Sequence, residues 1–344
     1  MLRRGWLAAV LAFAFAFAAQ GSEPAEKLKV CATLPELGSL VRAIGGDAVE
    51  ATVFAKGTED AHFLEAKPSF VTSLARADAL ALVGLDLEIG WAPALWEQAR
   101  NARVQPGGGG HWDCSRVIEP LEIPAVPVDR SMGDVHPGGN PHFLLDPLEG
   151  LKVAGFLKER LSELRPAQRA QFEENLTAFR RALCERLAGP ELAGAYDAEK
   201  LARLHAGGKL LGFLESQGQR AKLGGWLGAM APHRGAEVVD DHALWPYLAR
   251  TFGLKIAAHL EPLPGMGPTS RHLAQVTKLM QERKIGVLVT SAHYDPKSAE
   301  LVSRRTGARI ARLAHSAGAL PGTGEYLDLL DHNVRTLAAA LANR

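Results

Sequence analysis

Residues 29–62 read KVCATLPELGSLVRAIGGDAVEATVFAKGTEDAH, and this stretch decides the fold. A strand-like run at 29–34 is followed by a helical pattern at 37–44 and by a second strand-like run at 49–55. A helix between two strands lets the strands lie parallel while the helix covers one face of the sheet. A third strand-like run follows at 79–84 after another helical pattern, so the first half predicts a mostly parallel α/β sheet.

The second half of the chain repeats this alternation of strands and helices. Similarity between the halves is too low for a sequence repeat, although the architecture indicates a duplication. The mature length of roughly 320 residues also exceeds the size at which one hydrophobic core stops growing, so two domains are expected. We predict two lobes, 27–146 and 200–344, each a mostly parallel sheet flanked by helices. The predicted strands of the second lobe are 237–240, 255–259, 286–290 and 309–313, and its predicted helices are 245–252, 270–284, 297–306 and 326–342.

The segment between the lobes begins as a glycine- and proline-rich stretch and continues as a helical pattern. Residues 106–147 are rich in glycine and proline and cannot hold a regular helix. Apolar side chains then recur at spacings of three and four over 147–187, which predicts an amphipathic helix. We expect Pro166 to interrupt or bend this helix, because proline loses a backbone hydrogen bond and clashes with the preceding turn. A single long spine helix is therefore predicted to join the two lobes.

The N-terminus has the pattern of an export signal. Two arginines precede a short apolar run at 7–17, which ends in a small-x-small cleavage pattern. We expect a signal peptide at 1–18, cleavage near Ala18 and location in the periplasm. The first cysteine is Cys31 and does not directly follow the cleavage point, so we expect a mature protein that is soluble and not lipid-anchored.

Charge and cysteine content exclude several classes of function. The charges nearly cancel, with 39 Lys plus Arg against 38 Asp plus Glu, so a polyanionic partner such as nucleic acid is not expected. We expect a monomer whose function depends on a local site. The three cysteines match no C-x-x-C motif; in an oxidising compartment we favour a disulfide between Cys31 and Cys114, with Cys184 as a buried helix residue.

Four of the twelve histidines occupy loop positions just after predicted strands or at helix starts. His62 and His142 belong to the first half, and His242 and His315 to the second, so a closed cleft between the lobes could bring all four together. Imidazole nitrogen suits Zn²⁺, and four such ligands complete a tetrahedron. A closed shell has no position for a substrate or an activated water, so the pattern predicts metal transport or storage and not catalysis.

Other polar residues near these histidines are candidates for supporting roles. His136 is a candidate fifth or substitute ligand, with a polar loop residue as the alternative. Histidine ligands usually donate their other ring N–H to a carboxylate or a carbonyl, so nearby acids are candidates for that role. Asp146 is better explained as the cap of the helix that begins at Pro147. The carboxylate candidates are Glu59, Asp60, Asp134, Asp240 and Asp241, and the histidines expected to be structural or exposed are His111, His205, His233, His259, His272, His293 and His332.

Seven segments occur in order along nearly the whole mature chain: Thr33-Leu34-Pro35, 57–62 with Glu65, Pro68-Ser69, 139–147, 241–247, Glu261-Pro262 with Gly265, and Tyr326-Leu327 with Asn333. Together they resemble the zinc/manganese solute-binding proteins of metal ABC importers. The resemblance implies two α/β lobes joined by one long helix, a metal ion buried between them, and a membrane permease as partner. By motif, His62, His142 and His242 fall on the family's first three ligand positions. His315 occupies the fourth, which is often an aspartate in this family.

The sequence departs from this family in two places. Many zinc members carry a long loop rich in histidine and acidic residues, whereas 107–139 is rich in glycine and holds only His111 and His136. The aspartate ligand is also replaced by an imidazole. Manganese prefers oxygen donors and an all-imidazole shell favours zinc, although copper or nickel would also bind such ligands tightly. We therefore predict Zn²⁺ as the bound ion, with Mn²⁺ less favoured.

The sequence thus predicts a periplasmic solute-binding protein that captures a transition-metal ion and delivers it to an ABC importer. An adhesin or a carrier of another divalent metal with the same fold is the alternative. A secreted zinc hydrolase is disfavoured because no H-E-x-x-H motif occurs. A carrier of an organic anion would need helix N-terminal amides with Arg or Lys in the cleft, where this sequence has histidines.

Overall fold

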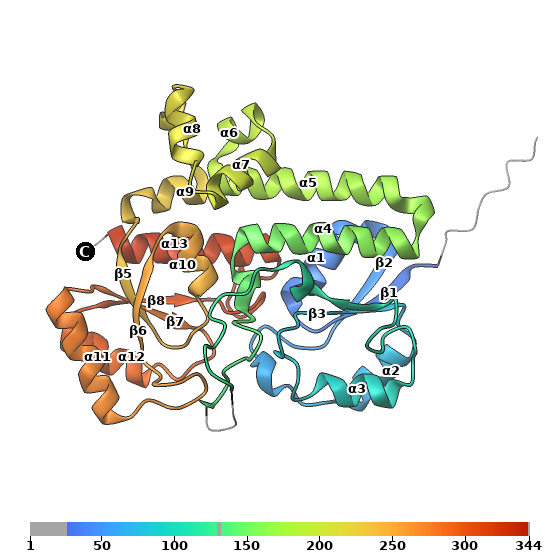
Figure 1. Cartoon of the computed structure of the whole chain (residues 1–344), viewed down its shortest axis with the longest axis horizontal. Coiled ribbons are helices and arrows are strands. Elements are labelled where there is room, and N and C mark those ends of the chain that lie inside the picture. The colour runs from blue at the N-terminus through green and yellow to red at the C-terminus, as the bar shows by residue number, and fades with distance from the viewer. Residues whose placement is uncertain (1–25, 129–131, 343–344) are drawn as a thin grey trace, which may run out of the picture.

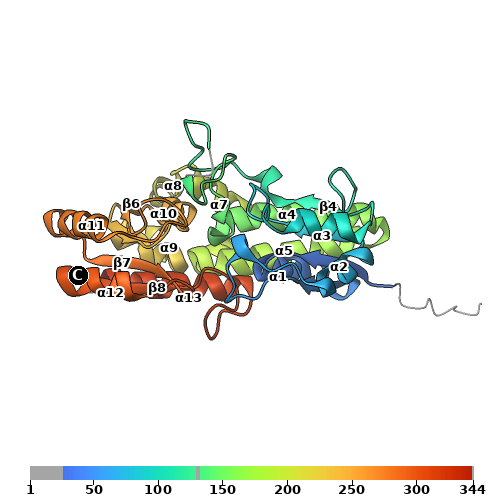
Figure 2. The ribbon, with the colours of Figure 1, turned by 90° about the horizontal axis from the view of Figure 1, so that it is seen from below.

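The computed structural model describes residues 26–128 and 132–342. The predicted signal peptide at 1–18 lies outside these residues. Within them, no helix is both long enough and apolar enough to span a bilayer. Figure 1 shows two α/β lobes with a layer of long helices across them, and Figure 2 shows the lobes at opposite ends of the long axis.

The first lobe is built on a four-stranded sheet of order β2-β1-β3-β4, in which every neighbouring pair is parallel. Strand β1 is almost entirely buried, as expected for a strand whose sheet is covered by helices on both faces. Helix α1 lies on one face, and α2 and α3 lie on the other (Figure 1). The elements are β1 (Leu28–Ala32), α1 (Pro35–Gly45), β2 (Val49–Val53), α2 (Pro68–Ala75), β3 (Ala79–Leu82), α3 (Ala92–Ala99) and β4 (His111–Asp113).

The second lobe has a sheet of the same kind, of order β6-β5-β7-β8 and again parallel throughout. In both lobes the chain passes from the first strand to an outer neighbour and then crosses back, so the topology is duplicated. These two sheets confirm the predicted fold class. The elements are β5 (Glu237–Asp240), α10 (Pro246–Phe252), β6 (Lys255–His259), α11 (Ser270–Arg283), β7 (Val287–Ser291), α12 (Lys297–Thr306), β8 (Arg309–Leu313) and α13 (Tyr326–Ala342).

The predicted single spine helix over 147–187 is wrong, because the segment folds into two helices. Helix α4 (Pro147–Leu164) ends before Pro166, and α5 (Arg169–Ala188) returns alongside it in the opposite direction (Figure 1). Arg165 has φ −135° and ψ 72°. A residue that precedes proline is kept out of the helical region by the proline ring, so the helix stops there and the chain reverses. Helix α5 alone carries the chain back towards the second lobe.

Several short helices between α5 and β5 were not predicted from the sequence. They form a small helical extension above the layer of long helices (Figure 1). Each has at most nine residues, which is too short for a clear periodic pattern. They are α6 (Pro190–Ala195), α7 (Ala198–Ala206), α8 (Leu210–Ser216) and α9 (Gly225–Met230).

The two lobes share one continuous hydrophobic core and meet at the start of α4. Asp146 caps α4 through the amide of Leu148, at 2.8 Å, which agrees with the role predicted for it. Its other carboxylate oxygen accepts a hydrogen bond of 2.7 Å from the Thr251 hydroxyl of α10 in the second lobe. The Tyr326 hydroxyl of α13 donates to the Asp146 carbonyl at 3.0 Å, and a Cβ on Gly150 would lie 1.9 Å from that hydroxyl. Glycine is therefore needed where α13 and α4 meet.

The favoured disulfide between Cys31 and Cys114 is wrong: both are free, as is Cys184, and all three are buried. Cys31 lies in β1, and Cys114 directly follows β4. Strand β3 separates β1 from β4, which puts the two backbones roughly 9 to 10 Å apart, beyond the reach of a disulfide. Cys184 is buried in α5, as expected.

We expect Asp146→Ala to lower the free energy of unfolding by about 2 to 4 kcal/mol, because it removes a helix cap and leaves the buried Thr251 hydroxyl without its acceptor. Asp197→Ala is a matched control. Asp197 caps α7 through the Lys200 amide at 2.9 Å but is exposed, so its loss should cost only about 1 kcal/mol. Urea denaturation measures both values. Equal losses would show that the contact between the lobes adds nothing to the cap.

Candidate metal centre

His62 is positioned by its neighbour Asp60 in a short 3₁₀ turn, Ala61–Phe63, that follows β2. The Asp60 carboxylate accepts hydrogen bonds of 2.9 Å from both the backbone amide and the ring Nδ1 of His62. Because Nδ1 donates its proton to Asp60, the lone pair is on Nε2 at the opposite side of the ring, where its neighbour is Nε2 of His136. Asp60 therefore occupies the supporting position that the sequence predicted for it.

His142 begins the 3₁₀ turn His142–Leu145 that leads directly into α4. Its backbone amide donates to the Asn140 side-chain oxygen at 2.9 Å. The Asn140 side-chain nitrogen donates to the carbonyl of Ala243, and the Tyr247 hydroxyl of α10 donates to the Asn140 carbonyl at 2.7 Å. The loop of His142 is thus held by the second lobe.

His242 follows β5 and is only 3% exposed. Its ring Nδ1 lies 2.6 Å from a Glu261 carboxylate oxygen that also accepts the Gly265 amide at 3.0 Å. This arrangement repeats the contact between His62 and Asp60 in the other lobe, and it again puts the lone pair on Nε2. The supporting role of Glu261 was not predicted, because 19 residues separate it from His242 and only the pairing of β5 with β6 brings them together.

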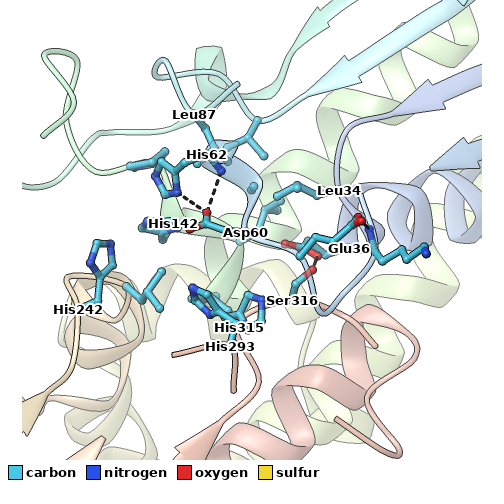
Figure 3. Close-up of a pocket in the computed structure, with 18 of the residues that line it drawn as sticks. Leu34, Glu36, Asp60, His62, Leu87, His142, His242, His293, His315 and Ser316 are labelled. Carbon is cyan, nitrogen blue, oxygen red and sulfur yellow. Dashed lines mark hydrogen bonds and ion pairs between the residues drawn. The ribbon is translucent and has the colours of Figure 1, made fainter. Parts of the chain in front are cut away.

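These three histidines converge on one cavity between the lobes (Figure 3). Their ring centroids are 5.4 Å apart for His62 and His142, 6.1 Å for His142 and His242, and 6.4 Å for His62 and His242. The cavity volume is about 40 Å³. His136 lies at the edge of this group, with its Nε2 atom 3.1 Å from Nε2 of His62.

His315 lines the same cavity but pairs with a histidine that the sequence analysis set aside. The rings of His315 and His293 are 4.0 Å apart. His293 follows β7, just as His242 follows β5, and these neighbouring strands are where the chain order of the sheet reverses. Ligands of such sheets bind at this point, beyond the carboxyl ends of the strands. That rule, already applied to the other histidines, would have identified His293.

Burial favours the neutral form of several imidazoles in and beside the cavity, next to a carboxylate that favours its anionic form. Loss of solvation, reinforced by His62 and His242, holds the pKa of His142 well below its usual value. Loss of solvation also lowers the pKa of His136 to about 4, and together with His315 lowers that of His293 to about 3. Burial raises the pKa of Asp60, but the hydrogen bonds and charge of His62 outweigh burial and bring it to about 2. Neutral imidazole is the form that binds metal ions.

The other predicted acids occupy different positions. Glu59 lines the histidine cavity, where it accepts the Lys56 amide at 2.7 Å. Asp134 lines a neighbouring cavity of about 280 Å³, together with His136 and Glu261. Asp241 does not line the histidine cavity; it accepts the amide of Ser291 at 2.6 Å, and burial raises its pKa to about 7. Asp241 thus connects β5 to the end of β7.

Asp240 and several histidines have structural contacts elsewhere. Asp240 lies 2.5 Å from Nδ1 of His259, and His272 donates to the His259 carbonyl at 2.9 Å. His111 and His205 donate to backbone carbonyls at 2.9 and 2.8 Å. These four histidines therefore have the structural contacts expected of them.

The donor set of the cavity is chemically suited to a borderline-soft dication such as zinc, copper or nickel. In the described part of the chain, no three His, Cys, Asp or Glu side chains already have donor atoms placed to hold one metal ion together. The rings of His62, His142 and His242 are nevertheless close to the separation of roughly 5 Å expected for imidazoles whose nitrogens lie 2.0 to 2.1 Å from one zinc ion.

Comparisons with known proteins match this chain to proteins named for metal uptake and metal binding. The family model described as "Zinc-uptake complex component A periplasmic" matches residues 30–187 and 226–340. The iron-binding protein YfeA of Yersinia pestis is 24% identical over 92% of this chain and 87% of its own length. The high-affinity zinc uptake system protein ZnuA of Paracoccus denitrificans is 23% identical over 93% of this chain and 92% of its own.

A solved structure of a zinc-bound ZnuA deletion mutant has the same fold. Its TM-score is 0.66 and its sequence identity 22%, over 92% of this chain and 98% of the other. The family match spans most of the chain and confirms the resemblance drawn from the sequence motifs. The chain therefore belongs to the family of the periplasmic component A of zinc-uptake complexes.

Proposed function

We propose that this protein is exported to the periplasm, captures a zinc ion between its two lobes and delivers it to the membrane permease of an ABC importer. One observation carries the proposal: histidines from three loops, far apart in sequence and drawn from both lobes, line one cavity. Two of them, His62 and His242, have their Nδ1 atoms held by carboxylates. Carboxylates in this position are typical partners of metal-binding histidines.

The size of the cavity favours a metal ion over an organic solute. Sites for small organic molecules usually occupy about 300 to 1,000 Å³. The histidine cavity has a volume of about 40 Å³, which suits an ion with little or no water. Its described lining includes five histidines but a single lysine, Lys56, and no arginine, whereas an anion-binding protein would need several such cations.

We consider two sets of four ligands, and His62, His142 and His242 belong to both. His315 is the fourth ligand proposed from the sequence, and His136 is the one favoured by geometry. Two nitrogens that bind one tetrahedral zinc ion lie roughly 3.3 Å apart, given zinc–nitrogen distances of 2.0 to 2.1 Å. The distance between Nε2 of His62 and Nε2 of His136 is 3.1 Å. Binding would still require small ring rotations to draw the remaining nitrogens together.

Zinc is favoured over manganese because the proposed ligands are imidazoles. Manganese prefers carboxylate, carbonyl and water oxygen atoms, whereas imidazole suits zinc, copper and nickel. The carboxylates of Asp60 and Glu261 are engaged by ring nitrogens and so serve as partners of the ligands. Relatives named for zinc and for iron both match over more than nine-tenths of this chain, so we infer the metal from the donor set and not from the family.

Calorimetric titration tests the proposal directly. We expect one Zn²⁺ per chain, binding at least ~100-fold tighter than Mn²⁺, and no heat from a panel of amino acids, sugars and oxyanions. Zinc at 1,000 times its Kd should add about 4 kcal/mol to the free energy of unfolding, because it binds only the native state. Tight binding of an organic solute, with none of zinc, would contradict the proposal.

His142→Ala should weaken zinc binding by at least ~100-fold, since loss of a direct ligand should cost more than the 10 to 100-fold typical of a supporting residue. His111→Ala is the matched control, because His111 donates to the Val104 carbonyl and does not line the histidine cavity. Competition with a chromogenic chelator measures both affinities. An unchanged affinity in His142→Ala would remove His142 from the site.

Glu261→Gln tests the partner of His242. The amide oxygen of glutamine can still accept from Nδ1 and from the Gly265 amide, so the substitution keeps the ring orientation but removes the negative charge that makes Nε2, the atom proposed to bind zinc, more basic. We expect zinc affinity to fall about 10 to 100-fold without loss of folding. Asp295→Asn, which changes an exposed carboxylate in the same lobe, should leave the affinity unaltered. Equal affinities in the two variants would contradict the supporting role of Glu261.

A further inference from the structure

The cavity contains a pair of histidines that lie outside the three ligands common to both proposed ligand sets. The rings of His293 and His315 are 4.0 Å apart and tilted by 47°. The Ser291 hydroxyl lies 2.8 Å from Nδ1 of His293, and the Ser291 amide donates to Asp241. The end of β7 therefore fixes His293 against His315.

Tyr294 contacts both this pair and one of the proposed ligands. Its ring stacks on His242, with centroids 5.3 Å apart, and also contacts His293 at 4.3 Å. Tyr294 therefore links His242 to His293, whereas the histidine that His293 contacts directly is His315, outside the group of His62, His142 and His242.

The ring nitrogens of His315 are poorly satisfied. Both are buried, and neither reaches a described residue within ordinary hydrogen-bond distance and angle, although the Glu59 carbonyl is near enough to the ring to oppose the lowering of its pKa by burial. Buried polar atoms without partners are rare in native proteins, and each such atom calls for an explanation such as a bound ion or water. A metal ion would satisfy one of the two nitrogens.

Asp60 is a third side chain of the cavity that lies near His293 and His315. In the view of Figure 3, its carboxylate lies between the ring of His62 and the pair of His293 and His315. Its negative charge acts on both members of the pair as well as on His62. Only one of its oxygens is used by His62. The pair therefore faces a carboxylate that can supply an oxygen ligand.

We propose that His293, His315 and Asp60 form a second, weaker position for the same divalent cation, next to the one at His62, His142 and His242. This inference rests on the proposed function. Two dications so close together repel strongly even at an effective dielectric constant of about 20, so the positions are filled in turn. An ion would pass between them by exchanging one imidazole at a time, with Asp60 as the Nδ1 partner of His62 at the first position and as an oxygen ligand at the second. His136 then completes the first position.

Zinc titration of paired variants tests this arrangement. His142→Ala disables the first position, and it should retain a weaker zinc site of one ion per chain. His142→Ala/His293→Ala should bind at least ~10-fold more weakly than His142→Ala, because the remaining site loses a direct ligand. His293→Ala alone should change the affinity of the intact site less than tenfold. His293→Gln, which keeps a hydrogen-bonding partner for Ser291, serves as a second variant if alanine disturbs folding.

The matched control is His142→Ala/His111→Ala, which should bind zinc as His142→Ala does. Equal affinities for His142→Ala/His293→Ala and His142→Ala would overturn the second position. The inference also fails if His293→Ala alone weakens binding as much as His142→Ala, since His293 would then be a ligand of the first site. Absence of zinc binding by the unaltered protein would instead refute the proposed function itself.

Discussion

The site depends on how two imidazole rings are held. Each of His62 and His242 has its Nδ1 hydrogen-bonded to a carboxylate, which fixes the tautomer and directs Nε2 towards the cavity. The two carboxylates come from different lobes and reach their rings in different ways, Asp60 through a local turn and Glu261 across two strands. Both lobes therefore present a ring that is oriented before an ion arrives, which lowers the cost of ordering on binding.

The contacts between the lobes at the start of α4 oppose changes in the separation of these rings. Asp146 ends the turn of His142, caps α4 and accepts a hydrogen bond from Thr251 of the second lobe. The shared hydrophobic core and the close packing of Tyr326 on α4 add to this constraint. Large hinge motion would expose that core to water, so capture and release are better served by movement of the loops that carry the histidines.

More imidazoles line the cavity and its edge than one tetrahedral ion can use. Neutral imidazoles in excess let an ion exchange one ligand for another without passing through a state with few ligands. A carrier must bind tightly enough to capture and still release to its permease. Additional imidazoles next to the proposed site could serve both requirements. They would lower the energy barrier for dissociation of the ion without lowering the stability of the bound state.

The sequence by itself determined the two parallel sheets, because strand and helix periodicities are local. It also singled out His62, His142 and His242, which line one cavity, because each lies next to a recognisable strand or helix start. It also indicated Asp60, which is two residues from its ring. Only the tertiary structure decided that Glu261 holds His242, that His293 pairs with His315, and that β3 keeps Cys31 from Cys114. Those outcomes depend on strand order and on the packing of the lobes, which bring together residues with no local sequence relation. The reversal of the chain at Pro166 depends on both the sequence and the tertiary structure. The proline in the sequence predicts where the helix breaks, but the packing of α5 on α4 determines the direction that the chain takes after the break.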